Sequence, residues 1–533
     1  MTAFNSELFI ASLAIIGVVV IISALLSGLI DRSGLPQVAV FLALGAALGP
    51  FGLSLLNISI DSPALRVVAV LSLALVLFTD AVSLNINVVR RHSGLAFRLL
   101  GPGTLLTAGL LGVAGWWLLG LSVPAATILG AALASTDPVL LRGVLRRRDI
   151  PEDARQPLQL ESGLNDAVLL PVVLVALAFI EPGNLLTGAS FAKLGLDLFI
   201  LGPGAGILIG LVGVAALDLI RKRLGIRRDY ESLYSLGVAF TAFAAAESVH
   251  GSGFLAAFAA GLTIAALDVE LCDCFIEYGA VTAEMLLLLT FVLLGSSLIW
   301  SGFTIINGPV LLFTAIAVLI RTPVYLLSLL GTEVDTRGRL LIAWFGPRGL
   351  SSLLLILLPV FAGVPGSDRL FAICSLVVLV SIVLHGGSPM LLARAARKRA
   401  LRDREDLESD SSSEANKDVR VEPAFQEAAT TKSSPTLPDH KSRIAACEIA
   451  GSAQPKITTT NANVGAQTIS TDELRELWQL DVPVTILDVR TERSIEDSSE
   501  QARGAVRMPP DDVVRRAKEL GLKKDAWLIA YCA

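Results

Sequence analysis

The sequence has few residues of the kinds that build metal centres or disulfide scaffolds. Its 533 residues include five cysteines and four histidines, which form no CxxC pair and no cluster at a metal-ligand spacing. Only 17% of the residues are charged, and the net charge of −5 is too small to indicate a polyanion such as nucleic acid as a partner. No Walker motif is present. We therefore expect no cofactor, no nucleic-acid partner and no nucleotide-driven chemistry.

Hydrophobic residues are abundant instead, at 53% of the chain with a mean hydropathy of +0.68. Residues 7–392 are a succession of apolar runs, each near the ~20 residues that cross a ~30 Å hydrocarbon core. No Lys or Arg precedes the first run, so we interpret it as a span rather than a signal peptide. We predict thirteen transmembrane segments, at 7–30, 35–50, 64–84, 95–119, 122–145, 156–180, 195–220, 231–248, 252–268, 278–300, 304–330, 338–360 and 368–392.

The basic residues between these segments alternate in number. Nineteen Lys and Arg follow the odd-numbered segments, when Arg339 in the first turn of segment 338–360 is included. Only Lys193 and Arg369, the latter in the first turn of segment 368–392, follow the even-numbered ones. Because retained basic residues accumulate on the cytoplasmic side, this pattern predicts an N-terminus outside and a C-terminal tail inside.

Two carboxylates lie deep within predicted segments, where an ionisable group is costly and indicates function. Asp137 is eight residues, about 12 Å, from the inner end of segment 122–145. Pro138 removes a backbone donor there and disfavours helical geometry at Asp137, which predicts a helix broken beside the carboxylate. Asp166 is ten residues, about 15 Å, into segment 156–180, so the two carboxylates reach similar depth.

Neighbouring oxygens complete a candidate site for a hard monovalent cation. Ser162 shares a helix face with Asp166, four residues later, and Glu161 shares one with Asn165. The predicted oxygen ligands are those of Asp137, Asp166, Ser162 and Thr136. The competing interpretations, which we consider weaker, are that Asp137 only ends a helix and that Asn165 and Asp166 only cap one.

A second interruption occurs in segment 338–360, where Gly346 and Pro347 precede Arg348. The two interrupted segments are seven apart, as expected if segments one to six and eight to thirteen are inverted repeats. Paired broken helices are the best sequence indication of a transporter's ion site. An acidic group at Asp137 and a basic one at Arg348 would balance the charges of crossing helix ends.

Other charged residues within the segments are expected to be structural. We predict an ion pair between Glu161 and either Arg321 or Arg348, because an unpaired charge at that depth would be costly. Asp80, near the inner end of segment 64–84, is equally well explained as an auxiliary ligand or as an interfacial residue.

The composition changes after residue 392. Residues 393–466 begin with basic residues and continue as a polar stretch that we interpret as a flexible cytoplasmic linker. Residues 467–533 form a small α/β piece, with a capping-box pattern at 470–473 and predicted strands at 484–489 and 527–531. The predicted fold class is thus an all-α polytopic membrane protein with two discontinuous helices, followed by an α/β fragment.

Four motifs resemble the monovalent cation:proton antiporters of the NhaP/NHE type. They are Thr-Asp-Pro at 136–138, Glu-Ser-Gly-Leu-Asn-Asp at 161–166, His-Gly-Ser-Gly-Phe-Leu-Ala at 250–256 and Gly-Pro-Arg-Gly at 346–349. The resemblance covers residues 1–392 and implies thirteen helices with inverted repeats, a homodimer and an elevator-like movement of a core domain.

The same resemblance implies roles for individual residues. Asp166 would carry the ion and the proton, and Asp137, Thr136 and Ser162 would complete the site. Asn165 beside Asp166 goes with electroneutral one-for-one exchange. Glu161 resembles a family glutamate held by an arginine, for which Arg321 is favoured over Arg348, and Asp80 matches an acid that often contributes to the site.

The tail resembles a rhodanese-like domain at residues 486–490, 504–506 and 531–532, where Cys532 would be the sulfur-carrying nucleophile. The chain stops at Ala533, so the anion-cradling loop is missing and we expect a truncated, regulatory or vestigial module without sulfurtransferase activity.

The function predicted from the sequence is antiport of Na⁺, or of Li⁺ or K⁺, against H⁺ across a bacterial-type cytoplasmic membrane. Protons and cations would compete for Asp166 and Asp137. A potassium exchanger or efflux system of the same fold is one alternative, and a membrane-tethered sulfurtransferase is another.

Overall fold

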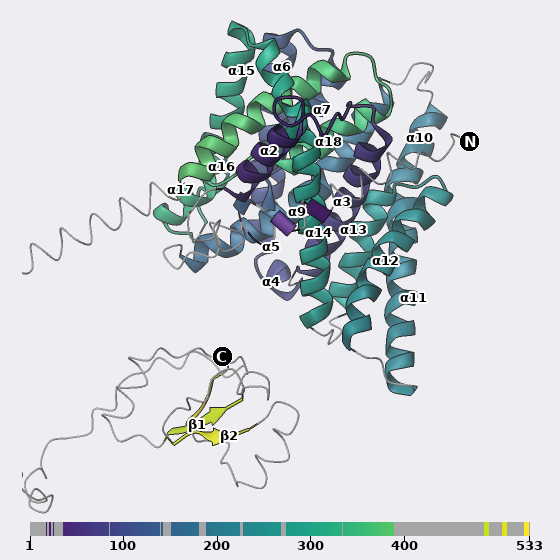
Figure 1. Cartoon of the computed structure of the whole chain (residues 1–533), viewed down its shortest axis with the longest axis vertical. Helices are drawn as coiled ribbons and strands as arrows, with labels where there is room; N and C mark the ends of the chain where they lie inside the picture. Colours follow the sequence, from purple (N-terminus) through teal and green to yellow (C-terminus); the bar gives the residue numbers. More distant parts are fainter. Residues whose placement is uncertain are drawn as a thin grey trace, which may run out of the picture. The chain divides into compact units, whose positions relative to one another are not determined.

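The computed structural model describes residues 17, 18, 21, 22, 25, 36–84, 86–138, 140–141, 151–180, 188–223, 228–267, 273–332, 334–388, 484–489, 504–508 and 527–531. The chain divides into two compact units, Met1–Glu422 and Pro423–Ala533. The described part of the first is mostly helical and that of the second contains a small sheet (Figure 1). The predicted boundaries at 392 and 466 lie outside the described residues and stay predictions.

The first half of the helical unit begins with α2 and ends with α11. Its elements are α2 (Gln37–Leu48), α3 (Pro63–Val82), α4 (Ile86–Arg91), α5 (Ser93–Arg98), the π-helix η1 (Leu99–Leu105), α6 (Leu106–Leu119), α7 (Val123–Ala134), α9 (Glu152–Ala178), α10 (Gly188–Leu196), the π-helix η2 (Asp197–Leu201) and α11 (Gly202–Arg223).

The second half begins with α12 and ends with an unlabelled last helix. Its elements are α12 (Arg228–Ser248), α13 (Gly253–Ala266), α14 (Asp273–Ser296), the 3₁₀-helix η3 (Leu298–Ile305), α15 (Gly308–Leu319), α16 (Arg321–Ser328), α17 (Thr336–Trp344), α18 (Leu350–Phe361) and the last helix, Ser367–Ser388.

Seven of the described helical stretches are long and apolar enough to cross a membrane. Their outward surface carries large exposed apolar side chains, including Trp117, Leu208 and Val383, which would be unfavourable in water and suit a hydrocarbon environment. A multi-pass helical membrane protein is therefore confirmed. Each predicted segment from 35–50 onward contains a described helix, but segment 7–30 lies mostly outside the described residues, so the count of thirteen stays a prediction.

The helices pack in two groups. The panel group consists of α2, α3 and α11 to α14, in which α13 contacts α3, α11 and α12, and α14 contacts α2 and α3. The core group consists of α5 to α7, α9 and α15 to α18, together with the last helix, which bonds to Trp344 of α17 and to Arg348. Figure 1 shows α15, α16 and α17 far from α11 and α12. Helix α3 contacts α9 and α18 and so joins the groups.

Small residues allow neighbouring helix backbones to approach closely. A methyl group on Gly45 of α2, Gly206 of α11 or Gly130 of α7 would overlap the backbone of α14, α13 or α6, respectively. Because lipid gives no hydrophobic drive for helix association, such close backbone packing is a main source of its stability.

Both predicted helix breaks are confirmed. Helix α7 ends at Ala134, residues 135–137 are not helical, and the chain turns helical again at Pro138. Helix α17 ends at Trp344, and α18 begins only at Leu350. In each case the residues between the helices leave backbone groups that must find partners elsewhere.

The second unit contains a parallel three-stranded sheet in the order β2-β1-β3, made of β1 (Val484–Asp488), β2 (Val506–Arg507) and β3 (Trp527–Tyr531). The two strands predicted from the sequence are thereby confirmed. The capping-box residues 470–473, the linker and Cys532 lie outside the described residues, and the resemblance to a rhodanese-like domain stays a prediction.

Candidate ion-binding site

The two broken helices cross, and their non-helical segments bond to each other. The backbone N–H of Asp137 donates to the carbonyl of Pro347 at 2.9 Å. In the other direction, the backbone N–H of Leu350, the first residue of α18, donates to Oδ2 of Asp137 at 2.7 Å. The Asp137 carboxylate therefore lies at the N-terminal, positive end of α18.

Arg348 binds the C-terminal end of α7, on the other side of the crossing. Its Nη1 donates to the carbonyls of Ala134 and Ser135, at 3.1 and 3.3 Å. The hydroxyl of Ser352 also donates to the carbonyl of Ser135, at 3.4 Å. These carbonyls belong to the C-terminal, negative end of α7, which lacks helical partners. The predicted balance of an acid and a base at crossing helix ends is thus present in the geometry.

Two glycines let the segments approach this closely. A Cβ atom on Gly349 would collide with the carboxylate of Asp137, and one on Gly346 would collide with the guanidinium of Arg321. The Gly-Pro-Arg-Gly motif therefore combines one positive side chain with two positions that leave room for other side chains.

Asp166 lies on α9 beside the first break and is 2% exposed. The hydroxyl of Ser135 donates to its Oδ1 at 2.5 Å. Its Oδ2 is buried and has no hydrogen-bond partner among the described residues. A buried carboxylate oxygen without a partner is rare in folded proteins, and it marks a position where a proton or a cation would be stabilised.

Asn165, the neighbour of Asp166, faces the other side of the break. Its Nδ2 donates to the hydroxyl of Thr136 at 2.5 Å, and Thr136 donates in turn to Oε1 of Glu161 at 3.2 Å. The Oδ1 atom of Asn165 is buried without a partner in the described part of the chain. The structure thus places Thr136 next to Glu161 and Asn165, whereas its neighbour Ser135 contacts Asp166.

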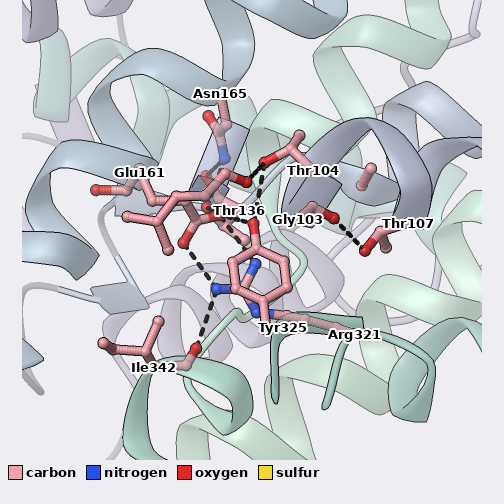
Figure 2. A network of polar contacts seen from close by, with 12 residues as sticks. Gly103, Thr104, Thr107, Thr136, Glu161, Asn165, Arg321, Tyr325 and Ile342 are labelled. Atoms are coloured by element: carbon pink, nitrogen blue, oxygen red, sulfur yellow. Dashed lines mark hydrogen bonds and ion pairs between the residues drawn. The ribbon is translucent and has the colours of Figure 1, made fainter. Parts of the chain in front are cut away.

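Glu161 is held by Arg321 in a two-pronged ion pair, with N–O distances of 2.8 and 2.7 Å (Figure 2). The hydroxyl of Tyr325 donates to Oε1 of Glu161 at 3.0 Å and contacts the hydroxyl of Thr104 at 2.9 Å. The guanidinium carbon of Arg321 lies 3.8 Å from the centre of the Tyr325 ring, in a cation–π contact. Between the two arginines considered from the sequence, the structure joins Glu161 to Arg321.

Two other predicted site residues lie less directly at the crossing. The hydroxyl of Ser162 donates to the carbonyl of Gln159 at 3.2 Å, within α9. Asp80 lies half-buried in the last turn of α3, a helix that packs against α9.

Sequence reasoning missed Ser135 and Tyr325. Ser135 could have been found from the predicted break, because side chains of an extended segment alternate between opposite sides. Ser135 and Thr136 must then point in different directions, and only one can accompany Asp166. Tyr325 lies four residues after Arg321 on α16, a spacing that places both side chains on one helix face.

The buried charges of the helical unit do not cancel. Among its described residues, the buried carboxylates are Asp137, Glu161 and Asp166, whereas the buried guanidiniums are Arg321 and Arg348. One negative charge is therefore in excess. The described residues contain no group of three or more His, Cys, Asp or Glu side chains that would hold a multivalent metal ion.

A multi-pass protein whose broken helices cross beside an unpartnered buried carboxylate has the architecture of a secondary transporter. Residues 18–394 match the family model described as "Sodium/hydrogen exchanger, transmembrane". The chain belongs to this family, whose members are secondary transporters (antiporters) and not enzymes.

Curated relatives agree with this assignment. The chain is 27% identical to the K(+)/H(+) antiporter NhaP of Alkalimonas amylolytica, over 72% of this chain and 66% of that protein. It is 30% identical to the K(+)/H(+) antiporter NhaP2 of Shewanella sp. (strain MR-4), over 70% of this chain and 65% of that protein. The match thus spans slightly less than two thirds of these relatives.

The fold resembles that of the sodium proton antiporter MjNhaP1 from Methanocaldococcus jannaschii. The TM-score is 0.58 at 21% sequence identity, and the match covers 72% of this chain and all of that one. This likeness supports the helical fold.

Proposed function

We propose that the protein exchanges an alkali cation for a proton across the membrane, and that both ions occupy the same position at Asp166. The observation that carries the proposal is the unpartnered Oδ2 of this buried carboxylate at the crossing of two broken helices. Family membership supports it independently.

Protonation and cation binding exclude each other at such a group. A proton on Oδ2 neutralises the carboxylate, and a cation on the same atom does so by coordination. Either one removes the single excess negative charge of the buried cluster. Movement of the site across the membrane is then favourable only when one of the two ions is bound, which couples the two fluxes.

The neighbouring residues have distinct roles in this scheme. Ser135 orients the Asp166 carboxylate through Oδ1, and Asn165 adds a buried oxygen without bringing a second charge. Asp137 accepts a hydrogen bond at the N-terminus of α18, where the helix end favours a negative charge. Thr136 links Asn165 to Glu161, while Ser162 and Asp80 are candidate auxiliary ligands. One titrating carboxylate is consistent with one-for-one, electroneutral exchange.

The transported cation is K⁺ or Na⁺. From the sequence we predict Na⁺, with Li⁺ or K⁺ as alternatives, whereas the names of these two relatives, both K(+)/H(+) antiporters, favour K⁺. We also propose that the core group moves against the panel group as an elevator, that two copies assemble as a homodimer, and that the N-terminus lies outside and the tail in the cytoplasm.

The test is exchange in proteoliposomes that contain the full chain and a pH-sensitive dye. Addition of K⁺, Na⁺ or Li⁺ outside should release protons from the acid-loaded interior, and choline should not. A preference for K⁺ over Na⁺ would follow the relatives, and the reverse would follow the sequence prediction. No cation-dependent proton movement with any of the three ions would refute the proposal.

A further inference from the structure

The last helix, Ser367–Ser388, contains two buried polar residues that the exchange scheme does not use. Ser381 is completely buried and His385 is 4% exposed, and they lie one turn apart. Both face the second broken helix rather than Asp166. Their contacts explain how the segment between α17 and α18 is held in a non-helical conformation.

Ser381 bonds directly to the broken segment. The backbone N–H of Arg348 donates to the hydroxyl oxygen of Ser381 at 2.7 Å. The same hydroxyl lies 3.1 Å from Nδ1 of His385. Since a backbone N–H can only donate, Ser381 accepts from Arg348, and its own proton needs an acceptor. We assign that proton to His385 Nδ1, the ring nitrogen 3.1 Å away, and this assignment makes the imidazole neutral with its own proton on Nε2.

The same turn of the last helix also holds the residue that ends α17. The rings of Trp344 and His385 have centroids 5.2 Å apart, tilted by 45°. Trp344 Nε1 donates to the hydroxyl of Ser388 at 3.2 Å, and Ser388 donates to the carbonyl of His385 at 2.9 Å. Two successive turns of the last helix, residues 381–388, therefore contact the broken helix at Trp344, before the break, and at Arg348, within it.

We propose that Ser381 and His385 are positioning residues for ion exchange, acting through Arg348. The chain from His385 through Ser381 to the Arg348 N–H fixes this backbone position. The fixed backbone directs the Arg348 guanidinium to the carbonyls of Ala134 and Ser135 and directs the Leu350 N–H to Asp137. The transport measurement described below assumes the proposed function, whereas the structural role of Ser381 and His385 does not depend on it.

A protonated His385 would not serve this purpose. It would donate from Nδ1 to Ser381, so the Ser381 hydroxyl would receive two donors and its own proton would lose its acceptor. It would also place a third positive charge beside a cluster whose other cations are Arg321 and Arg348. The excess negative charge that the exchanged ions neutralise would then disappear.

The experiment separates the hydrogen bond from packing by three variants. Ser381→Ala removes the link, His385→Phe keeps a ring against Trp344 without the Nδ1 acceptor, and His385→Asn keeps an acceptor near the position of Nδ1. Ser375→Ala is the matched control, because Ser375 is a completely buried serine of the same helix whose hydroxyl has no partner among the described residues.

The first readout is hydrogen–deuterium exchange of the purified full chain over residues 345–350. We expect faster exchange there in Ser381→Ala and His385→Phe, and wild-type exchange in His385→Asn and Ser375→Ala. The second readout is transport in proteoliposomes. There Ser381→Ala and His385→Phe should raise the cation KM about fivefold with a smaller change in kcat, as expected from loss of one buried hydrogen bond, and His385→Asn should restore most of the affinity.

The outcomes distinguish the inference from the proposed function. A wild-type protein without cation/proton exchange would overturn the function, and the deuterium result would still decide the positioning role. Wild-type exchange of residues 345–350 in both Ser381→Ala and His385→Phe would overturn the inference. So would an unchanged KM in these variants while wild-type transport is intact.

Discussion

The two broken helices meet at one crossing but use the chain in different ways. At residues 135–137 the side chains make the important contacts, with Ser135 on Asp166, Thr136 on Glu161 and Asp137 on the N-terminus of α18. At residues 345–349 the backbone dominates, through the carbonyl of Pro347, the N–H of Arg348 and two glycines that leave room for other groups.

The comparison shows that each break carries a side chain opposite in sign to the helix end that it faces. The acid of the first break meets the positive end of α18, and the base of the second meets the negative end of α7. Both charges of the crossing are thereby balanced locally, whereas Asp166 belongs to neither break and has one buried oxygen without a partner among the described residues. Asp166 is therefore the carboxylate that we propose for the mobile ion. The following variants test this division of roles, in order of decreasing expected effect.

The Asp166→Asn substitution removes the buried carboxylate that lies beside the crossing of the two broken helices. We expect exchange to fall below detection, because the amide cannot bind a proton and a cation alternately, while the protein still folds without a buried charge. Proton release in proteoliposomes is the measurement. Asp368→Asn, which changes an exposed carboxylate at the start of the last helix, is the control and should exchange normally. Wild-type flux in Asp166→Asn would contradict the assignment.

The Gly349→Ala substitution tests whether the second break depends on its backbone. The added methyl group would collide with the carboxylate of Asp137, and overpacking of this kind typically costs about 1–3 kcal/mol. We expect at least about a tenfold loss of exchange activity, from displacement of the crossing. Gly387→Ala in the last helix, where a methyl group would meet no atom within 4 Å, should leave activity unchanged. Equal activity of the two variants would contradict the role of Gly349.

The Glu161→Gln substitution tests whether the two arginines have separate partners. It leaves Arg321 buried without its carboxylate, which typically costs about 3–5 kcal/mol. The thermal unfolding midpoint in detergent should fall, and Arg321→Met in the same protein should restore part of it. Arg348→Met should give no such recovery, since Arg348 bonds to the end of α7. If Arg348→Met rather than Arg321→Met restored the unfolding midpoint of Glu161→Gln, Arg348 would be the partner of Glu161, and the proposed division of roles between the two breaks would be wrong.

Two substitutions in the first break, Ser135→Ala and Thr136→Val, test whether these neighbouring side chains point to opposite sides, one to Asp166 and the other to Glu161. Ser135→Ala should raise the cation KM about fivefold, because the Asp166 carboxylate loses its donor. Thr136→Val should mainly lower the free energy of unfolding, by about 1 kcal/mol, because it removes a link between Asn165 and Glu161. Equal effects of both changes on KM would mean that the two hydroxyls share one side.

Sequence patterns predicted the features that depend on local chemistry. The apolar runs located the helices, and Pro138 and the pair Gly346 and Pro347 located the two breaks. The depth of Asp137 and Asp166 brought both carboxylates to the same region, because distance along a helix is set by its rise per residue.

Features that depend on direction could not be obtained from spacing alone. Helical periodicity places Ser162 on the same face as Asp166, yet its hydroxyl is satisfied by its own helix. The extended backbone after Ala134 reverses the expected order and turns Ser135, rather than Thr136, to Asp166. The links from the last helix to Arg348 join residues 33 positions apart, and such tertiary contacts have no local signature.

The single excess negative charge of the buried cluster has a consequence for the energy source of the cycle. A potential of 100 mV does about 2.3 kcal/mol of work on each elementary charge that crosses the membrane. With either a proton or an alkali cation bound as proposed, the cluster would be neutral, and so the voltage would do no net work on its movement. An exchanger built on this cluster would be driven by concentration differences alone, and collapsing the membrane potential with an ionophore would leave its equilibrium unchanged.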